Sequence, residues 1–372
     1  MKIKRIVLYH VVMKLKSPFE TSFGKSILRH GVLVQVFDYE GNDGWGEVVA
    51  DEGPWYSYET VETAIHIVRD FFPMFLKDAE ISHPSEITNL LKRIRGHNMA
   101  KAGVEEAIWD LYAKINNEPL YKVLGGVRDR IVSGVSIGIQ ESLDKLVNVV
   151  GSYLELGYRR IKIKIKPGWD VNAVEAVRKE YPDIMFQVDA NAAYKLSDAE
   201  IFKRLDNYNL LMIEQPLDWN DLVDHAELAK MIKTPICLDE SIKDYHDAES
   251  ALKLNSCKII NIKPGRVGGL EITRKISNLC LQNNRGAWIG GMLETGIGRG
   301  ILVASATLPG ITYPSDISAS DRYYEEEIVE PPWVLNPDGT ISVRNKPGIG
   351  VEVLDEKIKK KYSKKIIEIQ LS

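Results

Sequence analysis

The sequence predicts an α/β protein in which a (β/α)8 barrel carries a smaller α+β unit. From about residue 130, short β-branched runs alternate with amphipathic helical stretches, a pattern typical of a parallel sheet. The predicted strand ends recur every 24 to 26 residues. A barrel requires such a constant period because each strand and helix spans the same height, whereas an open doubly wound sheet has fewer strands and less regular spacing. The eight predicted strand ends are Gly138, Lys164, Asp189, Glu214, Asp239, Lys263, Trp288 and Tyr313.

The segments on either side of the barrel lack this period. Residues 3–15 alternate as a strand, residues 17–24 form a loop, and residues 32–49 form a hairpin that turns on Gly41 and Gly44. Apolar spacing predicts helices over 59–72, 84–94 and 99–115, and within the barrel over 171–180, 199–205 and 270–283. Short strands follow at 341–343 and 348–354. We expect a first domain over residues 1–127, a barrel over 128–320, and a tail over 321–372 that returns to the first domain.

Composition narrows the functional classes. The 372 residues are 44% hydrophobic and 27% charged with a formal charge of −4, as expected for an ordinary soluble globular protein. No long basic block supports nucleic-acid binding, and the basic stretch over 356–370 is best explained as a solvated helix face leading into a strand. No signal or membrane-spanning segment is present, and the three cysteines, Cys237, Cys257 and Cys280, form no disulfide or metal pattern. We therefore expect a cytoplasmic protein that contacts neither nucleic acid nor membrane.

Five consecutive predicted strands end in charged residues. Chemistry in barrel enzymes takes place at the carboxyl ends of the strands, so charges at these positions are functional candidates. Because side chains alternate along a strand, Lys162 and Lys164 share one face of their strand, while apolar neighbours such as Ile163 face the helices. The charges are therefore expected to point into the barrel mouth.

Three of these residues, Asp189, Glu214 and Asp239, are acids on adjacent strands. Three inward carboxylates repel one another unless a cation lies between them, and an all-carboxylate set suits Mg²⁺ rather than zinc. Taken singly, each acid could instead cap a helix, as Asp239 and Ser241 could do for the helix that follows. Five charged strand ends at one period favour the metal site.

The lysines indicate proton transfer next to a carboxylate. Lys164 and Lys263 lie on strands four apart in the ring, so they are expected to face opposite sides of a substrate between them. A metal-bound substrate carboxylate would stabilise the enolate formed when the α-proton leaves. The cation and the like charge of Lys162 are expected to lower the lysine pKa from about 10.4. Two opposed bases allow racemisation, whereas one base with a cationic partner allows β-elimination.

Other motifs give no comparable signal. The glycine-rich stretch over 296–300 lacks the dinucleotide fingerprint, no P-loop is present, and the seven histidines are scattered. A Schiff-base aldolase could use a strand-six lysine, but the three acids would then have no role. A non-catalytic relative is disfavoured by the intact set of lysines and acids.

These motifs together resemble the enolase superfamily, and within its muconate-lactonizing subgroup the branch of o-succinylbenzoate synthases and N-acylamino acid racemases. The resemblance covers essentially the whole chain. Its segments are KIKIKPGWD (162–170), QVDAN (187–191), IEQPL (213–217), TPICLDESI (234–242), NIKPGRVGG (261–269), GGMLETGIGR (290–299) and SASDRYY (318–324), with GWGEVVA and AIWDLYAK in the N-terminal part. The resemblance implies a modified TIM barrel, (β/α)7β, under an α+β capping domain built from the N-terminal segment and the C-terminal tail.

The resemblance also implies roles for single residues. Asp189, Glu214 and Asp239 would hold Mg²⁺, for which Mn²⁺ may substitute in such enzymes, and Lys164 and Lys263 would be the acid/base pair. Residues 17–24 would be a mobile loop that closes over the substrate, and an ordinary mobile surface connection is the less favoured alternative. The implied substrate-binding residues are Lys162, which would also support Lys164, and Ser136, Asn191, Gly291, Met292, Leu293, Tyr56 and Tyr323.

Two activities fit this branch. One is syn dehydration of 2-succinyl-6-hydroxy-2,4-cyclohexadiene-1-carboxylate, a step of menaquinone synthesis, with Lys164 as base and Lys263 as the cation that stabilises the enolate. The other is racemisation of N-succinyl or other N-acyl amino acids by both lysines, and Arg266 resembles members with both activities. We expect the synthase, with the racemase as the alternative, a small carboxylate as substrate and a homo-oligomeric assembly. Dipeptide epimerase and muconate cycloisomerase activities match the motifs less well.

Overall fold

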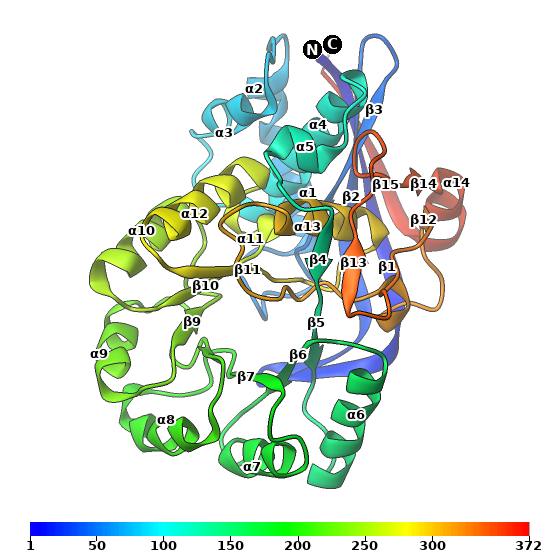
Figure 1. The fold of residues 1–372 in the computed structure, drawn as a ribbon. Coiled ribbons are helices and arrows are strands. Elements are labelled where there is room, and N and C mark those ends of the chain that lie inside the picture. The colour runs from blue at the N-terminus through cyan, green and yellow to red at the C-terminus, as the bar shows by residue number, and fades with distance from the viewer. Residues whose placement is uncertain (372) are drawn as a thin grey trace.

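The computed structural model describes residues 1–371 and shows a cap beside a curled barrel (Figure 1). The cap contains a four-stranded antiparallel sheet in the order β15-β1-β2-β3. Its strands are β1 (Ile3–Thr21), β2 (Gly24–Asp38), β3 (Asp43–Val48) and β15 (Ser363–Gln370). Its helices are α1 (Val61–Phe71), α2 (Pro73–Leu76), the 3₁₀ helix η1 (Pro84–Glu86), α3 (Ile87–Leu90), α4 (Asn98–Ile115) and α5 (Leu120–Leu124).

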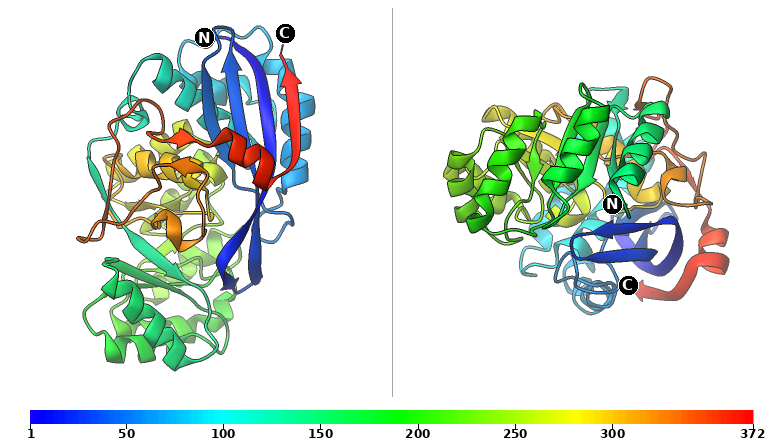
Figure 2. Two further views of the ribbon diagram at one scale, coloured as in Figure 1. Left: turned by 90° about the vertical axis from the view of Figure 1, so that its right-hand side faces the viewer. Right: turned by 90° about the horizontal axis from the view of Figure 1, so that it is seen from below.

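The C-terminal tail returns to the cap, as the sequence predicts. Strand β15 pairs antiparallel with β1, so that Arg5 faces Gln370 and Tyr9 faces Ile366. The two ends of the chain therefore lie together at the far end of the cap sheet (Figure 2). Ser372, the last residue of the expected tail, lies outside the described residues.

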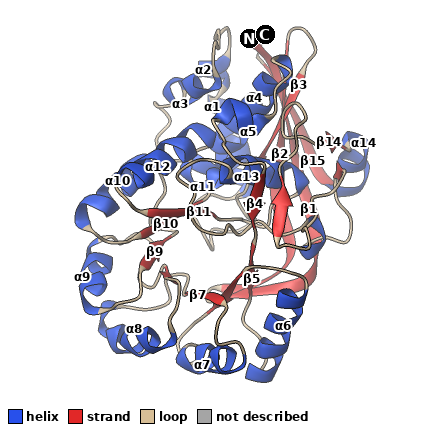
Figure 3. Cartoon of the chain, viewed as in Figure 1, coloured by secondary structure: helices blue, strands red, loops and turns tan. Residues whose placement is uncertain are grey.

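The barrel strands form one parallel sheet in the order β11-β10-β9-β8-β7-β6-β5, with helices on its outer side (Figure 3). Its strands are β5 (Gly134–Ile137), β6 (Arg160–Lys164), β7 (Met185–Asp189), β8 (Ile213–Glu214), β9 (Ile236–Leu238), β10 (Ile259–Ile262) and β11 (Gly286–Ile289). Its helices are α6 (Leu143–Glu155), α7 (Val171–Glu180), η2 (Leu196–Asp198), α8 (Ala199–Leu205), η3 (Asp206–Tyr208), α9 (Val223–Met231), α10 (Tyr245–Leu254), α11 (Pro264–Val267), α12 (Leu270–Gln282) and α13 (Gly296–Ala306). Short elements complete the chain: β4 (Arg130–Val132), η4 (Ser320–Arg322), β12 (Val329–Glu330), β13 (Thr340–Ser342), β14 (Glu352–Val353), α14 (Asp355–Lys357) and the π-helix η5 (Ile358–Tyr362).

The eighth barrel strand, predicted to end at Tyr313, does not form within the described residues. The chain from 312 to 316 still closes the ring, because Gly134 donates to the Ser315 carbonyl at 2.7 Å and Asp316 donates to the Ile289 carbonyl at 2.9 Å. Ser315 forms only an isolated bridge to Ser133. Irregular backbone at this position gives the Asp316 side chain a direction that a regular strand would not impose.

The predicted loop over 17–24 is also corrected by the structure. It belongs to a long hairpin in which β1 and β2 pair as far as Thr21 and Gly24, so only the two residues at its tip form a turn. This hairpin extends from the cap sheet towards the barrel (Figure 2). Likewise, the helix predicted over 84–94 is limited to the short η1 and α3.

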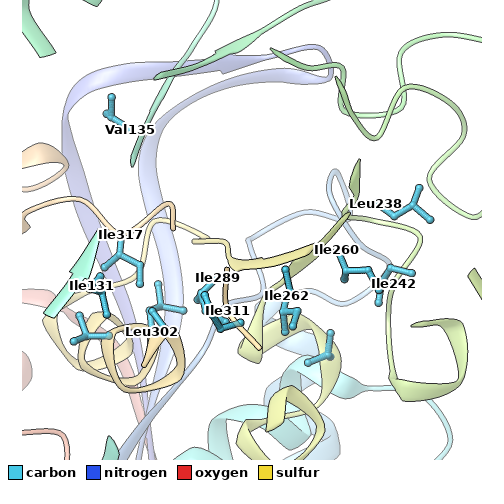
Figure 4. Packing of buried hydrophobic residues seen from close by; sticks show 14 of the residues in the cluster. Ile131, Val135, Leu238, Ile242, Ile260, Ile262, Ile289, Leu302, Ile311 and Ile317 are labelled. Carbon is cyan, nitrogen blue, oxygen red and sulfur yellow. The ribbon is translucent and has the colours of Figure 1, made fainter. Parts of the chain in front are cut away.

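The main core lies between the barrel sheet and its helices. Apolar residues such as Ile163, Val188 and Ile262 are buried there, as strand alternation predicts. Figure 4 shows part of this cluster, where Ile262 and Ile289 from β10 and β11 pack near Ile311. A second cluster lies between the cap sheet and α1 and α4. These apolar side chains point outwards from the barrel, whereas a small third cluster that contains Trp288 lies on the inner side, where the ring centre is 4.9 Å from Lys162 Nζ.

Buried acids join the cap to the barrel. Glu47 of β3 accepts hydrogen bonds from the Thr295 amide (3.1 Å) and hydroxyl (2.6 Å) and from the Gly298 amide (3.1 Å), where α13 begins. Glu105 of α4 accepts from the amides of Leu270 and Glu271, where α12 begins. The amides at a helix N-terminus lack partners within the helix and attract negative charge. These carboxylates therefore hold the cap over the barrel mouth.

Candidate active site

The charged residues predicted at the strand ends meet at the barrel mouth. In the parallel ladder Lys164 is paired with Asp189, and Asp189 with Glu214. Asp239 follows β9 directly and Lys263 follows β10 directly. From β6 to β10, neighbouring strand ends therefore present a lysine, three acids and a second lysine. The two lysines lie on opposite sides of the acids.

The three acids form a compact buried group. One oxygen from each of Asp189, Glu214 and Asp239 lies within 4.8 Å of the other two, and all three side chains have no exposed surface. Three carboxylates this close are unfavourable without positive charge between them, and no histidine or cysteine belongs to the set. The group can hold a metal ion, and its oxygen-only ligands fit a hard divalent cation.

Lysine and arginine side chains neutralise the acids from the side. Lys164 Nζ lies 2.6 Å from Asp189 Oδ2, and Lys263 Nζ lies 2.9 Å from Asp239 Oδ2. The guanidinium of Arg266 also contacts Asp239. A cation bound by the acids would compete with these ammonium groups, so the ion pairs place both lysines directly beside the metal position.

At Lys162 and Lys263 the neighbouring side chains raise the pKa rather than lower it. Burial lowers the pKa of Lys162, but the charges of Asp316, Glu214 and Asp189 outweigh it, and the pKa lies above its ordinary value. Burial likewise lowers the pKa of Lys263, but Tyr56 and nearby acids raise it further.

A cavity of about 580 Å³ lies between the cap and the barrel mouth and extends over these groups. Ten residues singled out from the sequence line it: Lys162, Lys164, Lys263, Ser136, Asn191, Gly291, Met292, Leu293, Tyr56 and Tyr323. The Ser136 hydroxyl is buried without a hydrogen-bond partner. Asn191 has a left-handed backbone (φ 43°), donates its amide to Asp189 Oδ1 at 3.0 Å and donates its side chain to Glu240 Oε1 at 2.9 Å.

Tyr56 brings the cap into contact with the charged centre. Its hydroxyl donates to Asp239 Oδ1 at 3.0 Å and accepts from Lys263 Nζ and from Arg266 Nη1, each at 3.1 Å. Burial raises the pKa of Tyr56, so it stays a neutral donor. Tyr323, from the segment after the barrel, packs edge to face on Phe19 with ring centroids 6.4 Å apart. Residues distant in sequence thus close the cavity.

The tip of the β1–β2 hairpin is seated on the barrel rim. The Ile139 amide donates to the Glu20 carbonyl at 3.0 Å, and the Ser22 hydroxyl donates to the Asn191 carbonyl at 3.1 Å. Lys166 Nζ lies 3.4 Å from Glu20 Oε1. Phe19, Phe23 and Lys25 on this hairpin line the cavity. A substrate that fills the cavity is therefore covered by the hairpin.

Three charged residues at the site, Arg160, Glu240 and Asp316, were not predicted from the sequence. Arg160 begins the strand that carries Lys162 and Lys164 and shares their face, so alternation could have found it. Glu240 follows a predicted metal ligand directly, and burial raises its pKa to about 6. Asp316 had no such signal because it lies beyond the predicted strand end in an irregular segment.

Two family models match this chain. Residues 3–125 match the "Mandelate racemase / muconate lactonizing enzyme, N-terminal domain", and residues 145–357 match the "Enolase C-terminal domain-like" model. The chain therefore belongs to the mandelate racemase and muconate lactonizing enzyme family of the enolase superfamily.

Proteins with closely similar sequences indicate the branch of this family to which the chain is related. It is 48% identical to an o-succinylbenzoate synthase of Bacillus subtilis over 98% of both chains. It is 46% identical to an N-succinylamino acid racemase of an Amycolatopsis species, over 96% of this chain and 97% of the other. An enolase superfamily structure from Listeria innocua superposes with a TM-score of 0.96 at 42% identity, with both chains fully covered.

Proposed function

We propose that the protein is a Mg²⁺-dependent o-succinylbenzoate synthase. The observation that carries the proposal is the arrangement of two lysines on opposite sides of a buried carboxylate triad, at the base of a cavity between the cap and the barrel. Full-length relatives named o-succinylbenzoate synthase support this assignment. The reaction converts 2-succinyl-6-hydroxy-2,4-cyclohexadiene-1-carboxylate to o-succinylbenzoate by syn loss of water.

Each residue has a role in this reaction. Lys164 removes the proton from the carbon that carries the carboxylate. The protonated Lys164 then donates this proton to the hydroxyl that leaves from the same face of the adjacent carbon, so that water departs and the aromatic ring is completed. Lys263 stays protonated as a cation near the ring. Lys162 binds the substrate carboxylate and supports Lys164. Mg²⁺, held by Asp189, Glu214 and Asp239, supplies positive charge for the carboxylate as charge develops on it.

The remaining lining residues position the substrate and exclude water. Ser136, with its unpartnered hydroxyl, and Asn191 offer polar contacts, while Gly291, Met292 and Leu293 provide one wall. Tyr56 and Tyr323 close the cavity from the cap and from the segment after the barrel. Exclusion of water strengthens each charge interaction in the site.

A second activity, racemisation of N-succinylamino acids, is supported by the symmetric placement of the lysines. Lys164 ends β6 and Lys263 directly follows β10. Each of these strands lies two strands away from β8, which carries Glu214. Each can act as base towards one face of an α-carbon and as acid towards the other. Buried Arg266, beside Tyr56 and Asp239, and the racemase relative in Amycolatopsis add to this support.

The wider setting is part of the same proposal. The cap comprises residues 1–127 with 321–372 and the barrel comprises 128–320. Mn²⁺ replaces Mg²⁺ in function, the substrate is a small carboxylate, and the enzyme acts as a homo-oligomer in the cytoplasm without a nucleic-acid or membrane partner. Within the described residues, no helix combines the length and apolar character needed to span a bilayer.

The proposal is tested by assaying the purified protein on the cyclohexadiene substrate. We expect Mg²⁺-dependent dehydration that a chelator abolishes and that Mg²⁺ or Mn²⁺ restores. Lys164→Ala is expected to lower kcat by at least about 10²- to 10⁴-fold, the usual contribution of a positioned base. Turnover that is indifferent to the chelator or to the Lys164 substitution would refute the proposal.

A further inference from the structure

Asp316 lies beside Lys162 although it belongs to none of the charged strand ends. It ends the irregular segment that closes the barrel, where its amide donates to the Ile289 carbonyl at 2.9 Å. Its Oδ2 lies 2.7 Å from Lys162 Nζ. Its side chain is 10% exposed and lines the cavity. A carboxylate at this point can act on the site only through Lys162 or through a bound molecule.

Arg160 fixes the other oxygen of this carboxylate. Its Nη1 lies 2.5 Å from Asp316 Oδ1, and its Nη2 donates to the Pro314 carbonyl at 3.1 Å. The guanidinium is fully buried and lies 5.0 Å from the centre of the Trp288 ring. A β-carbon at Gly134 would lie 2.5 Å from its Cζ, so the glycine provides the space that it fills. The Asp316 carboxylate is thus paired with a buried cation on the side away from Lys162.

Three carboxylates lie within reach of the Lys162 ammonium. Besides Asp316 at 2.7 Å, these are Glu214 at 3.0 Å and Asp189 at 3.3 Å. Of the three, Asp316 is the one outside the metal triad. A divalent cation in the triad would compete with Lys162 for the oxygens of the other two, since both seek the same negative charge.

We infer that Asp316 is a positioning residue that gives the Lys162 ammonium a carboxylate partner outside the metal triad. Lys162 also contacts Asp189 and Glu214, and without Asp316 these two triad acids are the only ones left of its three carboxylate partners. Because an unpaired buried charge is costly, a divalent cation in the triad would then have to take the last counter-charges of Lys162. The inference rests on the proposed function in one respect, namely that the triad binds a divalent cation.

The test is the affinity of the purified, full-length protein for Mn²⁺ alone, measured by electron paramagnetic resonance without substrate. We expect Asp316→Asn to weaken binding by about 10- to 100-fold, the range for groups that orient metal ligands indirectly. In a Lys162→Met background, which removes the competing ammonium, the same substitution should weaken binding by less than about threefold. Asp338→Asn, which breaks an exposed ion pair with Arg130, is the matched control and should change nothing.

A conservative variant keeps the test interpretable if Asp316→Asn does not fold. Asp316→Glu retains the charge but displaces it by one methylene, so it should weaken Mn²⁺ binding several-fold with Lys162 present and not in the Lys162→Met background. Equal affinity with and without the Asp316 carboxylate, or an equal loss in both backgrounds, would overturn the inference while leaving the proposed function intact. A wild-type protein that binds no Mn²⁺ would refute the proposed function first.

Discussion

Replacing Gly138 with alanine should lift the β1–β2 hairpin from the barrel rim. A β-carbon at Gly138 would lie 2.8 Å from the Glu20 carbonyl oxygen and 3.0 Å from its nitrogen. Ordinary contact begins at 3.4 Å, so the hairpin must retreat by about 0.6 Å. The hydrogen bond from the Ile139 amide to Glu20, now 3.0 Å, would then lengthen to about 3.6 Å, which is beyond bonding distance.

The energetic consequence follows from that hydrogen bond. Its loss is worth about 1 kcal/mol, which increases the population of the open hairpin about fivefold. The neighbouring ion pair between Glu20 and Lys166 is partly exposed and adds little. Because the closed form still predominates, we expect KM for the substrate to rise by much less than the open population does.

Trypsin cleavage after Lys25, an exposed residue near the hairpin tip, reports the open population directly. The cleavage rate of the folded variant, divided by that of the same protein unfolded in urea, should rise about fivefold. Gly24→Ala is the matched control, since nothing lies within 4 Å of its β-carbon. Equal cleavage rates and KM values for Gly138→Ala and Gly24→Ala would refute this account of how the hairpin is seated.

Three further outcomes are expected. Glu214→Gln should abolish measurable Mn²⁺ binding and dehydration while leaving the far-ultraviolet circular dichroism unchanged, and retained metal binding would contradict the triad assignment. Gly46→Ala places a β-carbon 2.2 Å from the Gly103 carbonyl oxygen and should destabilise the cap by at least about 1–3 kcal/mol in urea unfolding, whereas Gly31→Ala, with its nearest contact at 3.7 Å, should not. Burial lowers the pKa of His225 below its ordinary value of 6.5, so the unfolded chain binds a proton at pH values where the folded protein still keeps this histidine neutral. The free energy of unfolding therefore falls as the pH drops below 6.5, by up to about 1.4 kcal/mol per pH unit. His225→Gln should flatten the change in unfolding free energy between pH 7.5 and 5.5 relative to the wild type, and an unchanged slope would argue against a neutral His225.

The sequence predicts the barrel well because the same strand-and-helix pattern recurs at a nearly constant spacing. The strand ends expected at Lys164, Asp189 and Glu214 are those observed, and those expected at Asp239 and Lys263 fall one residue after the strands end. Strand alternation also places Ile163 in the core outside the barrel and its neighbours Lys162 and Lys164 in the cavity at the barrel mouth.

What the sequence did not predict depends on contacts between distant segments. The regular spacing of strand ends predicts a strand that ends at Tyr313, but it cannot predict how the chain closes the barrel. The irregular closure at Ser315 and Asp316 is set by hydrogen bonds to Gly134 and Ile289. Residues 17–24 contain proline and glycine, as a loop would, yet residues 19–21 pair with 24–26 across a two-residue turn, and the hairpin tip rests on the barrel rim near Ile139.

Exchange of the substrate α-proton tests the central claim, that Lys164 and Lys263 face opposite sides of a substrate carbon. Each enantiomer of an N-succinyl amino acid is incubated in D₂O with Mg²⁺ and the wild type, Lys164→Ala or Lys263→Ala. The wild type should exchange and racemise both enantiomers. Each variant should racemise neither and exchange only one, and the exchanged enantiomer should differ between the two variants. Exchange of the same enantiomer by both variants, or of both enantiomers by either one, would contradict the account.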